Sequence, residues 1–179
     1  MSAPATTPPR QWEFQLRTIE DLEQLNRRLG THVEAIEDVS ILASPVAFDG
    51  LTIPNSLSVH AMEGCDGDAQ GRPSKLTLRR YERFGAGGAG LLWAEAIAVL
   101  PEARANPRQL WLHEGSKDAF AEMVRRARAK AAEANGKDHR PVMVCQLTHS
   151  GRYSKPDGAA RPIIGQRDPY RDCLVPQWP

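Results

Sequence analysis

The chain has 179 residues, which is enough for one domain with a hydrophobic core. Lysine and arginine number 23 and aspartate and glutamate number 22, so the net charge of +1 gives no reason to expect nucleic acid or an acidic membrane as the main partner. Hydrophobic residues make up 41% of the chain, and proline and glycine contribute 14 residues each, which indicates many connecting segments.

Compartment and redox state are predicted from what the chain lacks. No stretch approaches the roughly 18 consecutive apolar residues of a transmembrane helix. The first ten residues contain no apolar segment of the kind found in secretory signal peptides. Cys65, Cys145 and Cys173 are odd in number and widely spaced, so neither a disulfide framework nor a zinc site is supported. We therefore expect a cytoplasmic protein with reduced thiols.

Residues 1–40 are interpreted as an N-terminal extension. Its first eleven residues are rich in proline, threonine and alanine and too poor in large apolar groups to order themselves. The string from Thr18 to Asp21 then matches a capping box in which aspartate replaces the preferred glutamate, and Gly30 is well placed to end the helix. One face of this short helix would carry Leu22, Leu25 and Leu29. The extension is expected to pack on the main body.

From residue 41 onward, apolar runs that suit strands alternate with helical patterns. In order, the predicted elements are a hairpin over 45–53, a strand over 56–62, a helix over 76–84, a strand over 91–99, a helix after Ser116 and a strand over 142–147. Asp49-Gly50 is a strong signal for the hairpin turn, and the two later strands are predicted to be buried. Ser116 is expected to cap its helix. The buried stripe of that helix would be Phe120, Met123, Val124, Ala127 and Ala131.

Strands that alternate with helices imply parallel strands joined by right-handed crossovers, and hence an α/β fold. Either an open doubly wound sheet or part of a (β/α)8 barrel satisfies this order. A loop is predicted over 63–73 between the first strand and the first helix. Residues 150–179 show no periodicity, so no helix is predicted after the last strand.

Three motifs resemble known functional sites, but their context does not support those functions. The glycine run from Gly85 to Gly90 matches the letters of a dinucleotide-binding loop, but it follows a predicted helix and leads into a strand, so a flexible connection is preferred. Ser150 lacks the glycine two residues earlier that a hydrolase nucleophile needs. Cys145 and His149 would share a metal only on a helix, so a buried thiol and a loop-end histidine are preferred.

Polar side chains fall near the ends of the predicted strands, at the edge where parallel α/β folds bind ligands. They are His60 to Glu63, Glu95, Gln146 and His149. A carboxylate inside an apolar strand is unfavourable to bury without a partner. Glu95 therefore either forms a structural salt bridge, for example with an arginine of the same barrel, or takes part in ligand binding. The residues alone leave both alternatives open.

Four strings resemble the Old Yellow Enzyme family of NADH:flavin oxidoreductases. They are Asn55–Gly64, which resembles the first barrel strand, Leu76–Val99, which resembles the first helix and second strand, Ala105–Leu110, which resembles the next loop, and Gln146–Arg152, which resembles the end of the third strand. The hairpin is similar to the one that closes the bottom of these barrels. Together the resemblance covers roughly residues 42–165, in the family's order.

The resemblance implies that residues 41–179 form the N-terminal hairpin and first three strands of an FMN-binding TIM barrel, incomplete as given. Such a flavoprotein is an oxidoreductase that takes hydride from NADH or NADPH and passes it to a small molecule such as an activated alkene. By position, Ala61, Met62 and Glu63 would lie against the isoalloxazine ring. Ala96 would offer a backbone contact, and Gln146 would hydrogen bond the pyrimidine edge.

Two departures from the family pattern matter. Family members usually have proline at the position of Ala61 and threonine or cysteine at that of Glu63. An ionised Glu63 would oppose the negative charge of reduced flavin and lower its potential. A whole barrel needs about 250 residues. The catalytic residues and the phosphate-binding loops are therefore expected in the missing C-terminal part of the barrel. We expect a truncated N-terminal part that is not active alone. The alternative is a non-catalytic barrel remnant, or a half-barrel that needs a partner chain. That partner would be a complementing C-terminal half or a second copy in a homo-oligomer.

Overall fold

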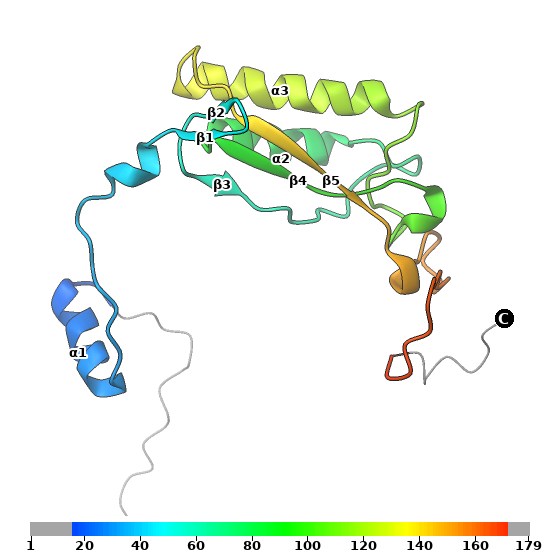
Figure 1. The fold of residues 1–179 in the computed structure, drawn as a ribbon. Coiled ribbons are helices and arrows are strands. Elements are labelled where there is room, and N and C mark those ends of the chain that lie inside the picture. Colours follow the sequence, from blue (N-terminus) through cyan, green and yellow to red (C-terminus); the bar gives the residue numbers. More distant parts are fainter. Residues whose placement is uncertain (1–15, 172–179) are drawn as a thin grey trace, which may run out of the picture. The chain divides into compact units, whose positions relative to one another are not determined.

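A computed structural model describes residues 16–171 of the chain (Figure 1). The expected tail at 1–11 and Cys173 lie outside these residues. The chain divides into two compact units, one up to Val39 and one from Ser40 onward. No helix in the described part is long and apolar enough to cross a membrane.

The first unit contains the helix α1, Ile19–Leu29. The predicted capping box is confirmed, because the Asp21 amide donates to Thr18 Oγ1 at 3.2 Å and the Thr18 amide donates to Asp21 Oδ2 at 3.0 Å. Gly30 ends the helix in the left-handed conformation, with φ of 63°, as predicted. Asn26 then holds the returning chain, since its side chain bonds both the amide and the carbonyl of Val33.

The second unit opens with a short 3-10 helix, Ser40–Ala43, and the predicted hairpin. The hairpin strands are β1, Val46–Phe48, and β2, Leu51–Ile53. Asp49 and Gly50 have φ of 46° and 75°, so both turn residues are left-handed. This geometry matches the right-handed twist of the flanking strands, and it explains why Asp-Gly was a reliable signal.

The main sheet has three parallel strands in the order β3-β4-β5. These are β3, Ser58–Val59, β4, Leu91–Ala98, and β5, Val142–Thr148. The helices α2, Lys75–Ala86, and α3, Lys117–Asn135, connect them and lie on the same side of the sheet (Figure 1). The predicted α/β fold with parallel strands is confirmed, and the sheet does not close. β3 is shorter than the strand predicted over 56–62.

The helix starts differ from the predictions in instructive ways. α2 begins one residue earlier than predicted, at a capping box that the sequence reasoning missed: Ser74 Oγ accepts from the amides of Leu76 and Thr77. Ser116 occupies the predicted N-cap position of α3, but its side chain makes no cap hydrogen bond. Its buried hydroxyl instead donates to the carbonyl of Trp111 at 2.9 Å and accepts from the amide of His113, so it closes the preceding turn.

The core lies between β4 and the two helices. Its members are Tyr81 and Ala89, then Leu92, Ala94, Ile97 and Leu110, and Phe120, Met123 and Ala127 of α3. Val124, predicted to belong to the buried stripe, is only half-buried. The prediction that β4 and β5 are buried on both faces is also wrong, because Trp93 is 44% exposed and Leu147 is 58% exposed. Helices cover only one face, and β5 is an edge strand.

Candidate functional site at the strand ends

An irregularity in β4 decides where Glu95 points. Trp93 pairs with Val144 and Ala96 pairs with Gln146, so β4 has two residues between these pairs where β5 has one. An extra residue of this kind changes the facing of the side chains that follow. Glu95 therefore turns toward α2, where it is only 2% exposed.

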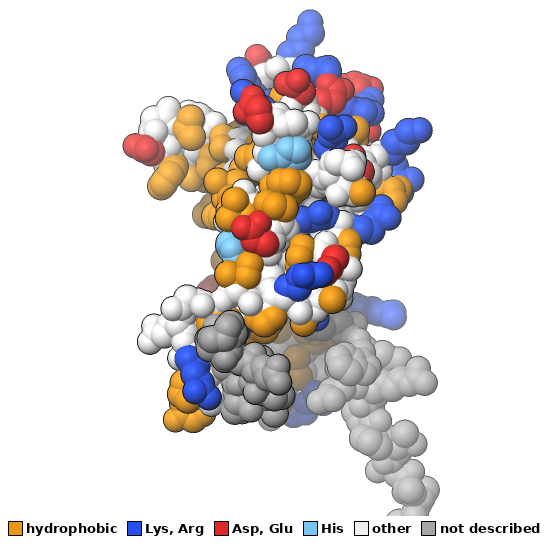
Figure 2. Space-filling view, turned by 90° about the vertical axis from the view of Figure 1, so that its right-hand side faces the viewer, with side chains coloured by type: hydrophobic (Ala, Val, Ile, Leu, Met, Phe, Trp, Pro, Cys, Tyr) orange, Lys and Arg blue, Asp and Glu red, His pale blue; other side chains and the backbone are white. Residues whose placement is uncertain are grey.

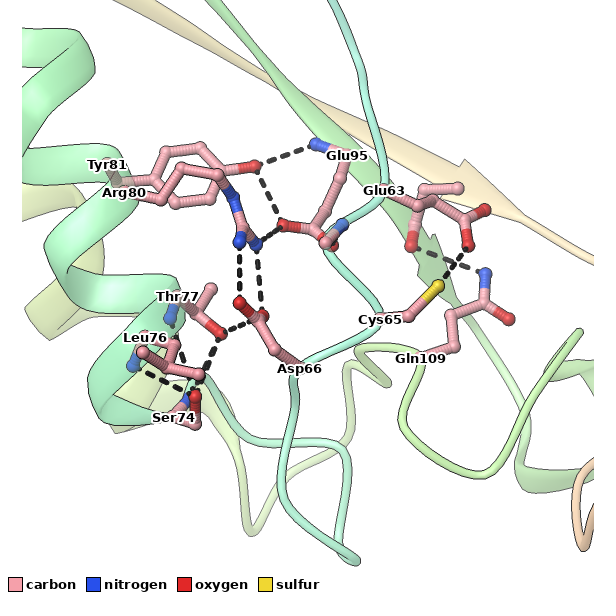
Figure 3. Close-up of polar contacts among 12 residues, drawn as sticks. Glu63, Cys65, Asp66, Ser74, Leu76, Thr77, Arg80, Tyr81, Glu95 and Gln109 are labelled. Atoms are coloured by element: carbon pink, nitrogen blue, oxygen red, sulfur yellow. Dashed lines mark hydrogen bonds and ion pairs between the residues drawn. The ribbon is translucent and has the colours of Figure 1, made fainter.

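Glu95 is surrounded by donors from two segments, α2 and the loop that follows β3 (Figure 3). Arg80 Nη2 lies 2.6 Å from its Oε1, and the backbone amide of Gly64 donates to its Oε2 at 2.9 Å. The Tyr81 hydroxyl accepts from the Glu95 amide at 2.8 Å and donates to Oε1 at 3.4 Å. Both carboxylate oxygens are thus satisfied, as a buried charge requires. The salt-bridge alternative for Glu95 is confirmed, with Arg80 as the arginine.

Arg80 bridges two carboxylates. Its Nη1 lies 2.5 Å from Asp66 Oδ2, while Nη2 contacts both Asp66 Oδ1 and Glu95. Thr77 donates to Asp66 Oδ1 at 2.6 Å. The bonds from Arg80 hold the pKa of Asp66 well below its usual range and raise the pKa of Arg80 itself. Burial raises the pKa of Tyr81, so its hydroxyl stays protonated. We call Asp66, Thr77, Arg80, Tyr81 and Glu95 the Arg80 network.

The Arg80 network ties α2 to the segment that follows β3. Glu95 accepts from the amide of Gly64, and Arg80 packs so closely that a Cβ at Gly64 would lie 2.1 Å from its Nη2. Two carboxylates hold this guanidinium, so it cannot easily move aside. A side chain at position 64 would therefore displace Arg80 from its carboxylate partners, and the bond from Gly64 to Glu95 gives the loop carrying residues 61–63 a fixed point directly after it.

An acid-stability experiment tests the charge state of the network. Because the pKa of Asp66 is depressed in the folded state, its ionised form stabilises the fold above about pH 4, and this contribution is lost as the pH falls. We expect Asp66→Asn to be less stable than the parent chain at pH 7 and to lose less stability between about pH 4 and pH 2. Urea unfolding at several pH values measures both. Asp118→Asn, at an exposed position, is the matched control. If the parent chain and Asp66→Asn lost the same amount of stability at low pH, the depressed pKa of Asp66 would be contradicted.

The predicted ring-contact residues fall into two groups. Ala96 and Gln146 are directly paired across β4 and β5, so the structure brings them together. The second group follows β3, the strand next to β4, and consists of Ala61, Met62 and Glu63. Of these, Met62 is 73% exposed. Within residues 16–171, the Gln146 side chain has no hydrogen-bond partner. Polar groups and exposed apolar groups thus share the strand-end region.

Glu63 lies apart from the Arg80 network. It turns away from Arg80 toward Cys65, whose thiol is 3.8 Å from Glu63 Oε2 (Figure 3). Partial burial, reinforced by the nearby Glu95 charge, raises the pKa of Glu63. The carboxyl therefore holds its proton more strongly than an exposed glutamate does.

Gln109 is a residue of this region that the sequence reasoning missed. It is buried, and its Nε2 donates to the carbonyl of Ala96 at 3.3 Å and to Thr148 Oγ1 at 3.4 Å. Its Oε1 accepts from the amide of Ala105. One amide therefore joins the ends of β4 and β5 to the loop between β4 and α3. A buried glutamine at a strand-end loop has no periodic signal; only its place in a family-like string could have drawn attention to it.

The remaining candidates are not brought together. His149 Nδ1 accepts from the amide of Gly151 at 2.9 Å, as suits a loop-end histidine. Cys145 is exposed on the edge strand, so the prediction of a buried thiol there is wrong. No group of three or more His, Cys, Asp or Glu side chains in the described part of the chain could hold a metal ion. The glycine run from Gly85 to Gly90 joins α2 to β4, as preferred over a dinucleotide loop.

The surface at this end carries exposed apolar groups. Figure 2 shows Lys, Arg, Asp and Glu side chains gathered over the upper part of this face, and hydrophobic side chains below them with single charged and His side chains among them.

Known proteins resemble part of the chain. No family model matches. An NADPH dehydrogenase of Halalkalibacterium halodurans is 30% identical over 125 residues, which are 69% of this chain and 33% of that protein. Over these residues the chain is similar to the Old Yellow Enzyme/NADPH dehydrogenase family. It spans about a third of the length of this curated relative.

Solved structures place the fold within the barrel of the Old Yellow Enzyme family. Morphinone reductase in complex with tetrahydroNAD matches with a TM-score of 0.52 and 22% identity, over 63% of this chain and 28% of that one. An Old Yellow Enzyme homologue from Zymomonas mobilis matches with 0.52 and 18%, over 62% and 28%. A 2-naphthoyl-CoA reductase complex matches with 0.57 and 14%, over 65% and 17%. The three parallel strands thus match a portion of a TIM barrel, and their sheet is not closed.

Proposed function

We propose that the chain supplies the ring-side contacts of an FMN site in an NAD(P)H-dependent flavin oxidoreductase. The observation that carries the proposal is the pairing of Ala96 with Gln146 at the carboxyl ends of parallel strands, where barrel enzymes bind their ligands. FMN, when bound, would accept hydride from NADH or NADPH and deliver it to an activated alkene or similar acceptor.

The residues present fit one side of a flavin. The Gln146 amide can donate and accept at once, which matches the adjacent carbonyl and N–H of the flavin pyrimidine edge. No protein group within the described residues competes for it. Ala61 and Ala96 are small, which leaves room for a flat ring close to the backbone. The Arg80 network holds the loop that carries Ala61 to Glu63 by its bond to Gly64.

The comparisons support this proposal through the family. The matched relative is an NADPH dehydrogenase, and morphinone reductase was solved with a nicotinamide analogue. The match covers a third of the relative, so in this proposal the phosphate-binding and substrate-activating groups of the working enzyme belong to the other two thirds. Activity would then need those parts, whether from the same polypeptide or from a complementing half.

Flavin binding tests the proposal. The chain, alone and together with the C-terminal two thirds of a family member, is titrated with FMN and followed by quenching of flavin fluorescence. Gln146→Leu is expected to weaken binding about five- to tenfold, the effect of one lost hydrogen bond. Gln24→Leu, on the exposed side of α1, is the control. Equal binding by both variants would overturn the role of Gln146, and no binding in either format would overturn the flavin site.

A second candidate is a non-catalytic half-barrel that exists only with a partner chain. The uncovered edge strand favours it, since Leu147 on β5 is 58% exposed. The same titration separates the two, because a remnant would pair with the complementing half without acquiring bound flavin.

Glu63 provides a separate prediction. Threonine at this position would remove a carboxylate that opposes the charge of reduced flavin. In a complemented, flavin-loaded protein, Glu63→Thr is expected to raise the flavin potential, and the gap between variant and parent should widen as the pH rises and Glu63 ionises. Spectroelectrochemical titration measures this gap at pH 5, near the reference glutamate pKa of about 4.3, and at pH 8, well above it. A potential that is unchanged at both pH values would contradict it.

A further inference from the structure

A single buried side chain links three segments at the carboxyl end of the sheet. Gln109 lies between β4 and α3 and is 2% exposed. Its Nε2 donates to the Ala96 carbonyl at 3.3 Å and to Thr148 Oγ1 at 3.4 Å, and its Oε1 accepts from the Ala105 amide. Both polar atoms of the amide thus have partners in the protein. Gln109 therefore acts on the strand ends and is not itself a group that a ligand would touch.

The Gln109 side chain meets the sheet on the face that carries Gln146. Ile97 packs in the core between β4 and the helices. Because side chains alternate along a strand, its neighbour Ala96 and the residue paired with Ala96, Gln146, lie on the opposite face. Thr148 is two residues beyond Gln146 on β5 and shares its face. Gln109 thus holds β5 on the side where the proposed ring contacts lie.

The backbone of Ala96 points away from β5. The Ala98 amide donates to the carbonyl of Leu110 at 2.8 Å, whereas the amide of the next residue, Val99, donates at 3.2 Å to a carbonyl of β5. Backbone groups two residues apart on a regular strand point to the same side, and the pairing is regular from Ala96 onward. The Ala96 carbonyl and amide therefore face the side on which Gln109 lies, and Gln109 binds the carbonyl.

The loop that carries Gln109 is shaped by other groups. Asn106 Oδ1 accepts from the Arg108 amide at 2.9 Å, and the backbone amide of Gln109 donates to the Asn106 carbonyl at 3.2 Å. Backbone bonds then tie residues 110–112 to Ala98. The turn and its attachment to β4 thus do not depend on the Gln109 side chain, which leaves the strand ends as the place where that side chain acts.

We propose that Gln109 is a positioning residue for the flavin ring, an inference that rests on the proposed function. Its bond to the Ala96 carbonyl fixes the Ala96 amide, which faces the same side and can donate to a ligand. Its bond to Thr148 fixes β5 just beyond Gln146. The pyrimidine edge of a flavin carries an N–H between two carbonyls, so one rigid edge can meet the Gln146 and Ala96 amides together. Gln109 sets the separation of these two groups, to which a rigid ring is sensitive.

FMN titration of a Gln109 variant tests the proposal, with the chain complemented by the C-terminal two thirds of a family member. Gln109→Met keeps the length of the side chain and removes both of its donor bonds. The dissociation constant of FMN is expected to rise about three- to tenfold, because ring contacts are displaced although their residues are unchanged. Quenching of flavin fluorescence measures the constant.

Ser116→Ala is the matched control. Ser116 is also buried in the connection between β4 and α3, and its hydroxyl bonds the carbonyl of Trp111 and the amide of His113 without touching the strand ends. We expect this variant to have a lower melting temperature and an FMN affinity within about twofold of the parent. If Gln109→Met does not fold, Gln109→Glu replaces it at pH 8, since its carboxylate keeps an acceptor for the loop but has no donor for Ala96.

A double variant shows whether Gln109 acts through the ring contacts. If it positions the group that Gln146 offers, then Gln109→Met has less left to disturb once that group is gone. Gln109→Met/Gln146→Leu should therefore weaken FMN binding by clearly less than the product of the two single effects. Loss of stability alone would leave the two effects on affinity independent.

The infrared spectrum of bound FMN reports on the Ala96 amide. A hydrogen bond lowers the stretching frequency of the carbonyl that accepts it, so a ring-carbonyl band should move to higher frequency in Gln109→Met and stay unmoved in Ser116→Ala. FMN labelled with ¹³C at each ring carbonyl in turn identifies the band.

The possible failures are distinguishable. FMN binding by Gln109→Met that equals binding by the parent, or an equal loss in Ser116→Ala, would overturn the positioning role and leave the proposed function standing. Independent effects in the double variant, with unmoved carbonyl bands, would do the same. Absence of FMN binding by the complemented parent would overturn the proposed function, and the inference with it.

Discussion

Replacing Arg80 with methionine is expected to lower the free energy of unfolding by about 3–5 kcal/mol, the range seen when one partner of a buried ion pair is removed. Glu95 is 2% exposed, so its carboxylate cannot regain the hydration that Arg80 replaces. Asp66 loses two hydrogen bonds at the same time. Methionine keeps most of the packing volume of the arginine stem, so the effect reports on charge. Urea unfolding followed by circular dichroism measures it.

Two control variants separate pairing from packing. Arg79→Met changes the exposed neighbour on the same helix and is expected to shift stability by less than about 0.5 kcal/mol. The double variant Arg80→Met/Glu95→Leu removes both charges and should regain much of the loss, because no uncompensated carboxylate remains in the interior. An Arg80→Met variant as stable as Arg79→Met would show that Glu95 is solvated in solution. A double variant that is less stable than Arg80→Met would show that the network matters mainly for packing.

Local sequence signals predicted the fold because they depend on neighbouring residues. The Thr18 capping box, the Asp49-Gly50 turn and the alternation of strands and helices each act over a few positions, and the structure confirms all three. Ser116 shows the limit of this reasoning. Its hydroxyl could serve α3 or the preceding turn with equal chemistry, and the fold of the 111–116 loop decided for the turn.

The candidate site was harder to predict because its geometry depends on a bulge. Alternation along β4 gives no sign that Glu95 will turn toward α2, since the extra residue shows only in the pairing with β5. The choice of Arg80 rather than one of the neighbouring arginines of α2 follows from how that helix docks. Gln109 was not predicted for the same reason, because its hydrogen bonds to β4 and β5 form only when both strands are in position. Family resemblance supplied what spacing could not, namely that Ala96 and Gln146 belong together.

The second large effect is expected at Gly85, where α2 and α3 touch. A Cβ at this position would lie 2.1 Å from the carbonyl oxygen of Ala127, far inside van der Waals contact. The obstacle is backbone, so the helices must separate or tilt, and the core between them must repack. We expect Gly85→Val to lose about 3 kcal/mol of stability, the upper part of the range for overpacked cores. Gly85→Ala should lose less, because alanine regains up to about 1 kcal/mol of helix propensity. Thermal and urea unfolding measure both.

Gly87 makes the comparison decisive. It has the φ of an ordinary right-handed residue, −68°, and a Cβ there would meet nothing nearer than 3.4 Å. Gly87→Ala is therefore expected to be neutral or to stabilise by up to about 1 kcal/mol, through the reduced freedom of the unfolded chain. The two glycines are two residues apart in one run, so composition and flexibility of the run are matched. If both alanine variants behaved alike, the glycines would serve the flexibility of the connection; opposite signs would show that Gly85 is there because two helices need its missing side chain.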